Sequence, residues 1–157
     1  MPFNYSSDEI KKKVSICLGV FQKNDSILLE VGVNERSIAH KFAEYLQAEF
    51  PDWNVDCEYN RNESLVKTLE GIHRCKDQRR TDRIYPDIIV HIRNTNENLL
   101  VVELKVDSDD NCDIEKLKLF TAPNGGYQYF HGLFLRFKTE SGKPLQRWFF
   151  GGREMTF

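Results

Sequence analysis

The sequence predicts an α/β fold in one domain, in which helices flank a central mixed β-sheet. Three observations lead to this class. The chain has 157 residues, enough for one ordinary domain with a buried core. Apolar residues recur at helical spacing near its start, whereas later runs rich in Val, Ile and Leu lie between polar turns, as in strands. The expected order is helix, helix, three strands, helix and two strands, in a single domain over 1–157.

The first helix is expected over 7–22. Ser6 and Glu9 have the spacing of a capping box, in which the hydroxyl accepts a backbone N–H and the carboxylate reaches back. Apolar residues follow at helical spacing, beside lysines that fit a solvated face. After a turn at 24–25, the mostly apolar stretch 26–33 fits either a strand or a helix.

A second helix is expected over 35–50, with Asn34 as its N-cap. Glu35 lies three residues before Ile38 and therefore on the apolar stripe of this helix, at its first turn. Two explanations are open for a charged residue at this position. Glu35 either stabilises the helix dipole or points into a site that the following strands build.

The first strand is expected over 53–59, where alternation places Glu58 on the more polar face. A long polar connection over 60–83 follows it. The second half of this connection is rich in basic residues, which form either a solvated surface or contacts to nucleic-acid phosphates. The candidate nucleic-acid-binding residues are Arg74, Lys76, Arg79, Arg80 and Arg83.

The remaining elements are four strands and a helix. Strong strands over 84–93 and 99–106 flank a turn-rich segment and predict a β-hairpin. A helix over 113–121 follows, with apolar residues on one side and a Pro-Asn-Gly-Gly segment at its end. Strands over 129–137 and 145–150 complete the sheet.

The hairpin brings three charged residues to one face of the sheet. If its turn centres on Thr95, Asp87 and Glu103 each lie eight residues from the centre and face each other across the strands. Lys105, two residues beyond Glu103, lies on the same face. These three are therefore the leading candidates for catalytic residues. The alternative is an ordinary hairpin with an exposed salt bridge.

The chemistry of this trio suits a bound cation. Two facing carboxylates repel each other, and a cation between them removes the repulsion. Mg²⁺ takes oxygen ligands, commonly one or two carboxylates with waters and a substrate phosphate. Such a site polarises a phosphodiester and lowers the pKa of a bound water. Lys105 can position that water, stabilise the charge on phosphorus or act as a base.

Pro86-Asp87 followed by Glu103-Leu104-Lys105 resembles the signature of the PD-(D/E)XK nuclease superfamily, which has the restriction-endonuclease-like fold. The family core is a helix, three strands, a helix and a strand (αβββαβ), and residues 35–137 have these elements in the same order after an extra N-terminal helix. The resemblance implies that Glu35 is the acidic residue that many members carry on the first core helix. Glu35 thus joins Asp87 and Glu103 as a catalytic residue and metal ligand. Glu58 has no firm counterpart and is a further candidate ligand.

The resemblance also implies an activity, which is Mg²⁺-dependent hydrolysis of phosphodiester bonds by an endo- or exonuclease that leaves a 5′-phosphate. Mn²⁺ is expected to substitute for Mg²⁺. DNA is the expected substrate ahead of RNA, in host defence, repair or a mobile element, and the protein is expected to act as a homodimer or within a larger complex. The basic insertion before Asp87 departs from the family pattern and leaves the substrate path open. The rival hypothesis is a catalytically silent module of the same fold that binds nucleic acid or a protein.

The composition limits these hypotheses. A net charge of −2 argues against a protein that coats nucleic acid through bulk positive charge, although a nuclease can carry a local basic surface. The absence of a long apolar run and of a secretory signal predicts a cytoplasmic protein without a membrane span. The four cysteines include no Cys-x-x-Cys pair and are expected to be reduced.

Overall fold

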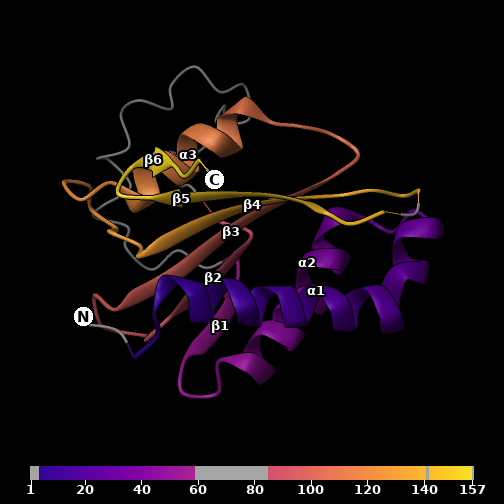
Figure 1. Cartoon of the computed structure of the whole chain (residues 1–157), viewed down its shortest axis with the longest axis horizontal. Coiled ribbons are helices and arrows are strands. Elements are labelled where there is room, and N and C mark those ends of the chain that lie inside the picture. The colour runs from indigo at the N-terminus through magenta and orange to yellow at the C-terminus, as the bar shows by residue number, and fades with distance from the viewer. Residues whose placement is uncertain (1–3, 59–84, 141, 157) are drawn as a thin grey trace.

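The computed structural model describes residues 4–58, 85–140 and 142–156 (Figure 1). Within these ranges the chain forms three helices and six strands, in the expected order with one short strand added at the end. The helices are α1 (Ser7–Glu30), α2 (Glu35–Glu49) and α3 (Asn111–Thr121). The strands are β1 (Asn54–Cys57), β2 (Ile88–His91), β3 (Asn98–Val106), β4 (His131–Phe137), β5 (Leu145–Phe150) and β6 (Arg153–Glu154).

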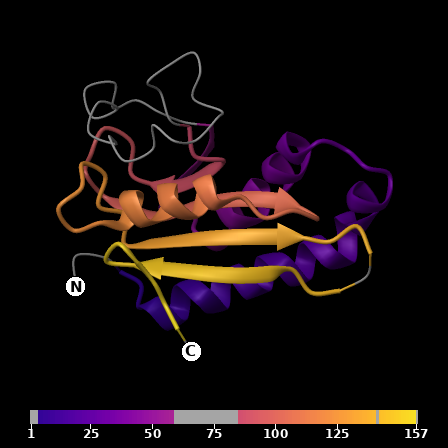
Figure 2. The ribbon, with the colours of Figure 1, turned by 90° about the horizontal axis from the view of Figure 1, so that it is seen from above.

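The six strands form one mixed sheet in the order β1-β2-β3-β4-β5-β6. β3 and β4 are parallel, with α3 in the connection between them, and all other neighbours are antiparallel. α1 and α2 cover one face of the sheet, and α3 lies on the other, as Figure 2 shows from above. The expected class, a mixed sheet flanked by helices, is therefore confirmed.

α1 begins as predicted but is longer than expected. The capping box forms, since the side chains and backbone N–H groups of Ser6 and Glu9 bond reciprocally. The turn expected at 24–25 is wrong, because the helix continues through it to residue 30. Within this stretch, the Tyr45 hydroxyl of α2 donates a hydrogen bond to Asp25. Contact with α2 therefore outweighs the turn propensity of the Asn-Asp pair.

α2 has the predicted N-cap and the predicted buried stripe. Asn34 Oδ1 accepts a hydrogen bond from the Ser37 N–H over 2.9 Å. Ile38 and Phe42 are fully buried on the inner side of the helix, together with other apolar residues at helical spacing. α2 packs beside α1, and the two helices form the larger apolar core with the sheet.

β2 and β3 form the predicted hairpin. Ile88 pairs with Val102, which is the register of a turn centred on Thr95. β2 is shorter than the sequence predicts, and the register shifts next to His91 at its end. β1 is also shorter than expected, because Glu58 has a left-handed φ of 47° and leaves the extended conformation.

The central strands are buried on both faces. From the register of the hairpin, its even-numbered residues contact α1 and α2, whereas Ile89 and Val101 pack under α3. Asp87, Glu103 and Lys105 follow the same alternation and lie on the α3 face. The face that carries the candidate chemistry is therefore a covered surface, not an open sheet.

The cysteines and the helices bear on two expectations drawn from composition. Cys17 and Cys57 are free thiols, as expected, and burial raises the pKa of Cys17 to about 12. Cys112 is disulfide-bonded, so the expectation of a reduced thiol is wrong for this residue. Among the described residues, every helix is too short or too polar to span a bilayer.

Candidate active site

Asp87 and Glu103 come together on the face of the sheet that α3 covers. Asp87 immediately precedes β2, and the hairpin register places it across from the middle of β3. The backbone N–H of Leu104 donates to Asp87 Oδ2 over 2.8 Å and fixes the carboxylate. The pairing that forms the hairpin therefore also positions both acidic residues.

Burial perturbs both carboxyl groups. Glu103 is only 1% exposed, and burial together with the charge of Asp87 raises the pKa of Glu103 well above its ordinary value of 4.5. Burial also raises the pKa of Asp87. The hydrogen bond between the two groups raises the pKa of Glu103 further and lowers that of Asp87.

Helix α3 adds a carboxylate and an ammonium group to this pair. Lys116 Nζ lies 2.7 Å from Asp113 Oδ1 and 3.5 Å from Glu103 Oε1. Asp113 is buried, and the Lys116 side chain is 18% exposed. Burial acts to lower the pKa of Lys116, but the carboxylates of Glu103 and Asp113 outweigh it and hold the pKa above its ordinary value.

Lys105 lies among three further acidic oxygens. Its Nζ is 3.5 Å from Glu35 Oε2, 3.7 Å from Asp113 Oδ2 and 3.8 Å from Asp110 Oδ2. Burial acts to lower the pKa of Lys105, and these three carboxylates raise it by more. The side chain is therefore a stable cation, which fits the stabilisation of developing negative charge better than the role of a base.

Glu35 reaches the site, whereas the Glu58 side chain does not. Besides its ion pair with Lys105, Glu35 Oε1 accepts a long hydrogen bond of 3.5 Å from the Val106 N–H. Of the two explanations for Glu35, a position facing the site is thus the one that the contacts favour. Glu58 pairs with Arg36 over 2.9 Å, and only its backbone N–H contacts Asp87, through the carbonyl oxygen.

The predicted nucleic-acid-binding residues all fall outside the described ranges. They are Arg74, Lys76, Arg79, Arg80 and Arg83.

Arg136 is a further cation at this end of the sheet, and the sequence did not single it out. It lies beside Lys105 in the parallel pairing of β3 and β4. Its guanidinium is 2.7 Å from Asp109 Oδ2.

We call the seven ionisable side chains at this end of the sheet the charged cluster. Its carboxyl groups outnumber its ammonium groups, so it holds an excess of negative charge. Buried Glu103 Oε1 and Asp113 Oδ2 accept no hydrogen bond. The members are Asp87, Glu103, Asp113, Asp110, Glu35, Lys105 and Lys116.

The charged cluster fits a hard divalent cation. Within the described ranges, no three His, Cys, Asp or Glu side chains stand together as a ready-made metal centre. Mg²⁺, however, commonly takes only one or two protein carboxylates and completes its shell with water and substrate oxygens. The Asp87–Glu103 pair meets that requirement, and the buried Oε1 of Glu103 accepts no hydrogen bond that a cation would have to replace.

Asp113 and Lys116 were missed as site residues, although their spacing carried a signal. Asp113 lies four residues before Leu117, and Lys116 four before Phe120, so both side chains border the buried stripe of α3. Lys116 is accordingly turned toward the sheet and largely covered. Sequence alone did not show that this border faces Glu103, because that depends on how the helix packs on β3.

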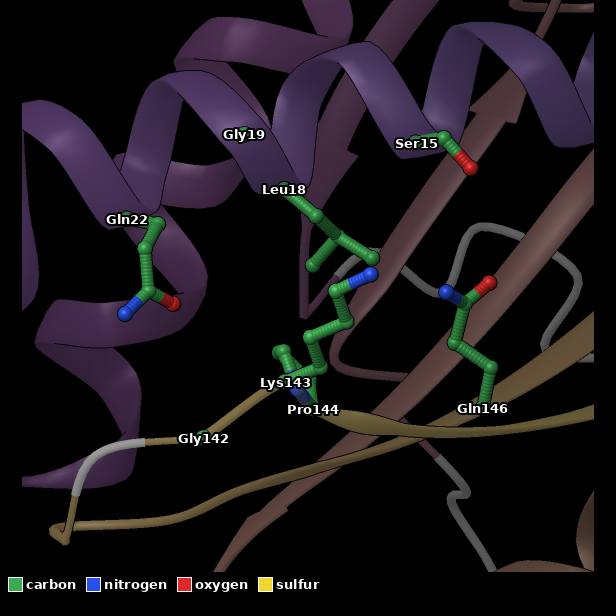
Figure 3. Close-up of a pocket in the computed structure, with 8 residues that line it drawn as sticks. All are labelled: Ser15, Leu18, Gly19, Gln22, Gly142, Lys143, Pro144 and Gln146. Carbon is green, nitrogen blue, oxygen red and sulfur yellow. The ribbon is translucent and has the colours of Figure 1, made fainter.

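A pocket of about 490 Å³ lies elsewhere, between α1 and the segment that leads into β5 (Figure 3). Polar groups of Ser15, Gln22, Lys143 and Gln146 line it, beside Leu18. α1 is on the opposite face of the sheet from α3, so this pocket is distinct from the charged cluster. None of the described acidic residues lines it.

No protein-family model, curated protein or solved structure matches this chain. One fold can carry many unrelated functions, so function has to be argued from the site. The geometry and electrostatics of the charged cluster are therefore the basis for a functional hypothesis.

Proposed function

We propose that this chain is a Mg²⁺-dependent nuclease that hydrolyses phosphodiester bonds, with DNA as its substrate. The observation that carries the proposal is the Asp87–Glu103 pair, buried and hydrogen-bonded across the hairpin, with an unbonded oxygen on Glu103. The order α2, β1, β2, β3, α3, β4 supports a restriction-endonuclease-like core, to which α1 is an addition. Lys105 lies two residues from Glu103 on the same face, as such a site requires.

Each residue has a distinct role in this proposal. Asp87 and Glu103 hold the cation, which when bound polarises the phosphodiester and lowers the pKa of a water molecule. Lys105 is a cation at the rim of the pair and stabilises negative charge that develops on the phosphoryl oxygens. Glu35 is a positioning residue, because it contacts the Lys105 ammonium and the backbone of the same strand.

One observation favours a second candidate, the catalytically silent binding module. Lys105 and Lys116 already pair with acidic side chains of the charged cluster, and such a network can serve structure alone. A binding module, however, gains nothing from two buried carboxyl groups that face each other. Replacing buried ionic groups with apolar ones is often neutral or stabilising, so a function is the stronger reason to retain them.

The deciding experiment is cleavage of supercoiled plasmid, linear duplex DNA, single-stranded DNA and RNA with Mg²⁺ or Mn²⁺. Loss of the metal-binding carboxylate in Glu103→Gln is expected to reduce cleavage by about a thousandfold or more, and EDTA is expected to abolish it. Glu97→Gln, in the exposed turn of the same hairpin, is the matched control and should cut like the wild type.

The outcomes separate the candidate functions. Cleavage that survives in Glu103→Gln would overturn the proposed site. An absence of both cleavage and cation-induced stabilisation would favour the binding module. Stabilisation by Mn²⁺ without cleavage would indicate that the nuclease needs a partner subunit.

A further inference from the structure

Lys116 holds its two carboxylate partners unequally. The 2.7 Å contact with Asp113, on the same helix, is a charge-assisted hydrogen bond. The 3.5 Å contact with Glu103 is an ion pair without a hydrogen bond, because Glu103 Oε1 has no hydrogen-bond donor. Lys116 is therefore anchored to α3 and contributes only its charge to Glu103.

Lys116 also supplies a large part of the positive charge at the centre of the charged cluster. The carboxyl groups of Asp87, Glu103 and Asp113 all act on its ammonium group. The other ammonium group, that of Lys105, pairs with Glu35, Asp110 and the outer oxygen of Asp113. Among the described residues, Lys116 is the cation that pairs with Glu103, so its removal would leave the buried Glu103 oxygen without this compensating charge.

A divalent cation on Glu103 needs the space and the electrostatic role that Lys116 has. The cation binds carboxylate oxygens at about 2.0–2.1 Å for Mg²⁺, which leaves no room for an ammonium group close to the same oxygen. A lysine ammonium on its flexible stem can move away while it stays bonded to Asp113. The double charge of the cation then compensates the carboxylates more fully than the single charge of Lys116 did.

We propose that Lys116 is the built-in counter-ion of the metal site, which competes with the divalent cation for Glu103 and moves away from Glu103, still bonded to Asp113, when the cation binds. This inference rests on the proposed function, since it takes Glu103 to be a metal ligand. Lys116 is a positioning residue in this scheme. It keeps the buried carboxylates compensated when the cation is absent, and it sets the cation concentration at which the site fills.

The test is the affinity for Mn²⁺, measured by calorimetry and by electron paramagnetic resonance of free Mn²⁺, without any nucleic acid. Lys116→Met removes the competing charge and is expected to bind Mn²⁺ at least about tenfold more tightly. In this variant no ammonium group keeps part of the protein population from binding the cation. Lys116→Arg keeps the charge and should stay close to the wild type. Lys118→Met is the matched control, since Lys118 pairs with Glu115 on the exposed side of the same helix.

A second measurement, thermal unfolding of Lys116→Gln, tests the inference in case Lys116→Met folds poorly. Lys116→Gln is expected to have a lower Tm than the wild type in EDTA and a larger rise in Tm on addition of Mn²⁺. An unchanged or weaker affinity in Lys116→Met, in a wild type that does bind Mn²⁺, would overturn this inference and leave the proposed function intact. If neither the wild type nor Lys116→Met bound Mn²⁺, this inference and the proposed function would both be overturned.

Discussion

The two faces of the sheet are made from the same strands and differ in what they bury. Under α1 and α2, the face is mostly apolar, with Phe42 and Phe137 in edge-to-face contact. Under α3, apolar residues such as Phe120 and Phe134 occupy one part, and the charged cluster occupies the rest. Neighbouring residues of β3 thus serve opposite purposes, because alternation sends every second side chain to the other face.

The difference between the faces shows where stability and function are located. Burial of apolar area on the α1–α2 face stabilises the fold, at roughly 25 cal/mol per Å² removed from water. Burial of carboxylates on the α3 face is unfavourable unless each charge is compensated. The apolar face therefore has to provide the stability that lets the other face keep Glu103 and Asp113 in place.

The largest expected effect on stability comes from the apolar face. Phe42→Ala empties a fully buried position between α2 and the sheet and is expected to reduce the free energy of unfolding by about 3–5 kcal/mol. Urea unfolding measures the loss. Below the unfolding transition, the affinity for Mn²⁺ should remain within about twofold of the wild type, because distant sites contribute independently. A parallel loss of Mn²⁺ affinity would show that the two faces are coupled.

A smaller effect on stability, with a defined pH dependence, is expected in the charged cluster. Glu103 keeps its proton in the folded protein to higher pH than in the unfolded chain, where its pKa is near 4.5. As the pH rises above 4.5 toward the folded pKa, wild-type stability in EDTA should fall by up to about 1.4 kcal/mol per pH unit from this group. Glu103→Gln cannot ionise and should lack this loss. Urea titrations of both proteins between pH 5 and 8 test it, and parallel profiles would contradict the assignment.

The smallest effect is expected where a predicted ligand lies outside the charged cluster. Glu58 makes an exposed ion pair with Arg36, and such pairs contribute about 0–1 kcal/mol. Glu58→Ala should therefore change the free energy of unfolding by less than about 1 kcal/mol. Cleavage by this variant should stay close to that of the wild type, in contrast to Glu103→Gln. A large loss of cleavage would return Glu58 to the list of metal ligands.

The sequence predicted the hairpin well because two local rules agree there. A period of two and a turn centred on Thr95 fix which residues of the strands face each other, and both rules act over short distances. The same local rules placed Glu103 and Lys105 on one face. The length of α1 was not predictable in this way, since its last turns depend on a contact between Asp25 and Tyr45 of another helix.

The part that α3 contributes to the site was also beyond the sequence. Asp113 and Lys116 have the pattern of a solvated border on an amphipathic helix, and only the packing of α3 on β3 turns that border toward Glu103. Charge spacing within a helix is visible in a sequence, whereas the direction in which a helix rolls on a sheet is a tertiary property. The pairing of Asp87 with Glu103 was therefore predictable from the sequence, and the side of α3 that faces Glu103 was not.

The register of the hairpin limits which changes its turn can accept. Residues 93–97 are exposed and join two strands whose side chains alternate in orientation. A residue inserted there that shifted the pairing by one position would turn Glu103 and Lys105 into the apolar core and present Val102 and Leu104 to α3. A bulge such as the register shift already present beside His91 can absorb an extra residue, and the strands then keep the pairing of Ile88 with Val102. The turn can therefore vary in sequence and in length as long as that pairing is kept.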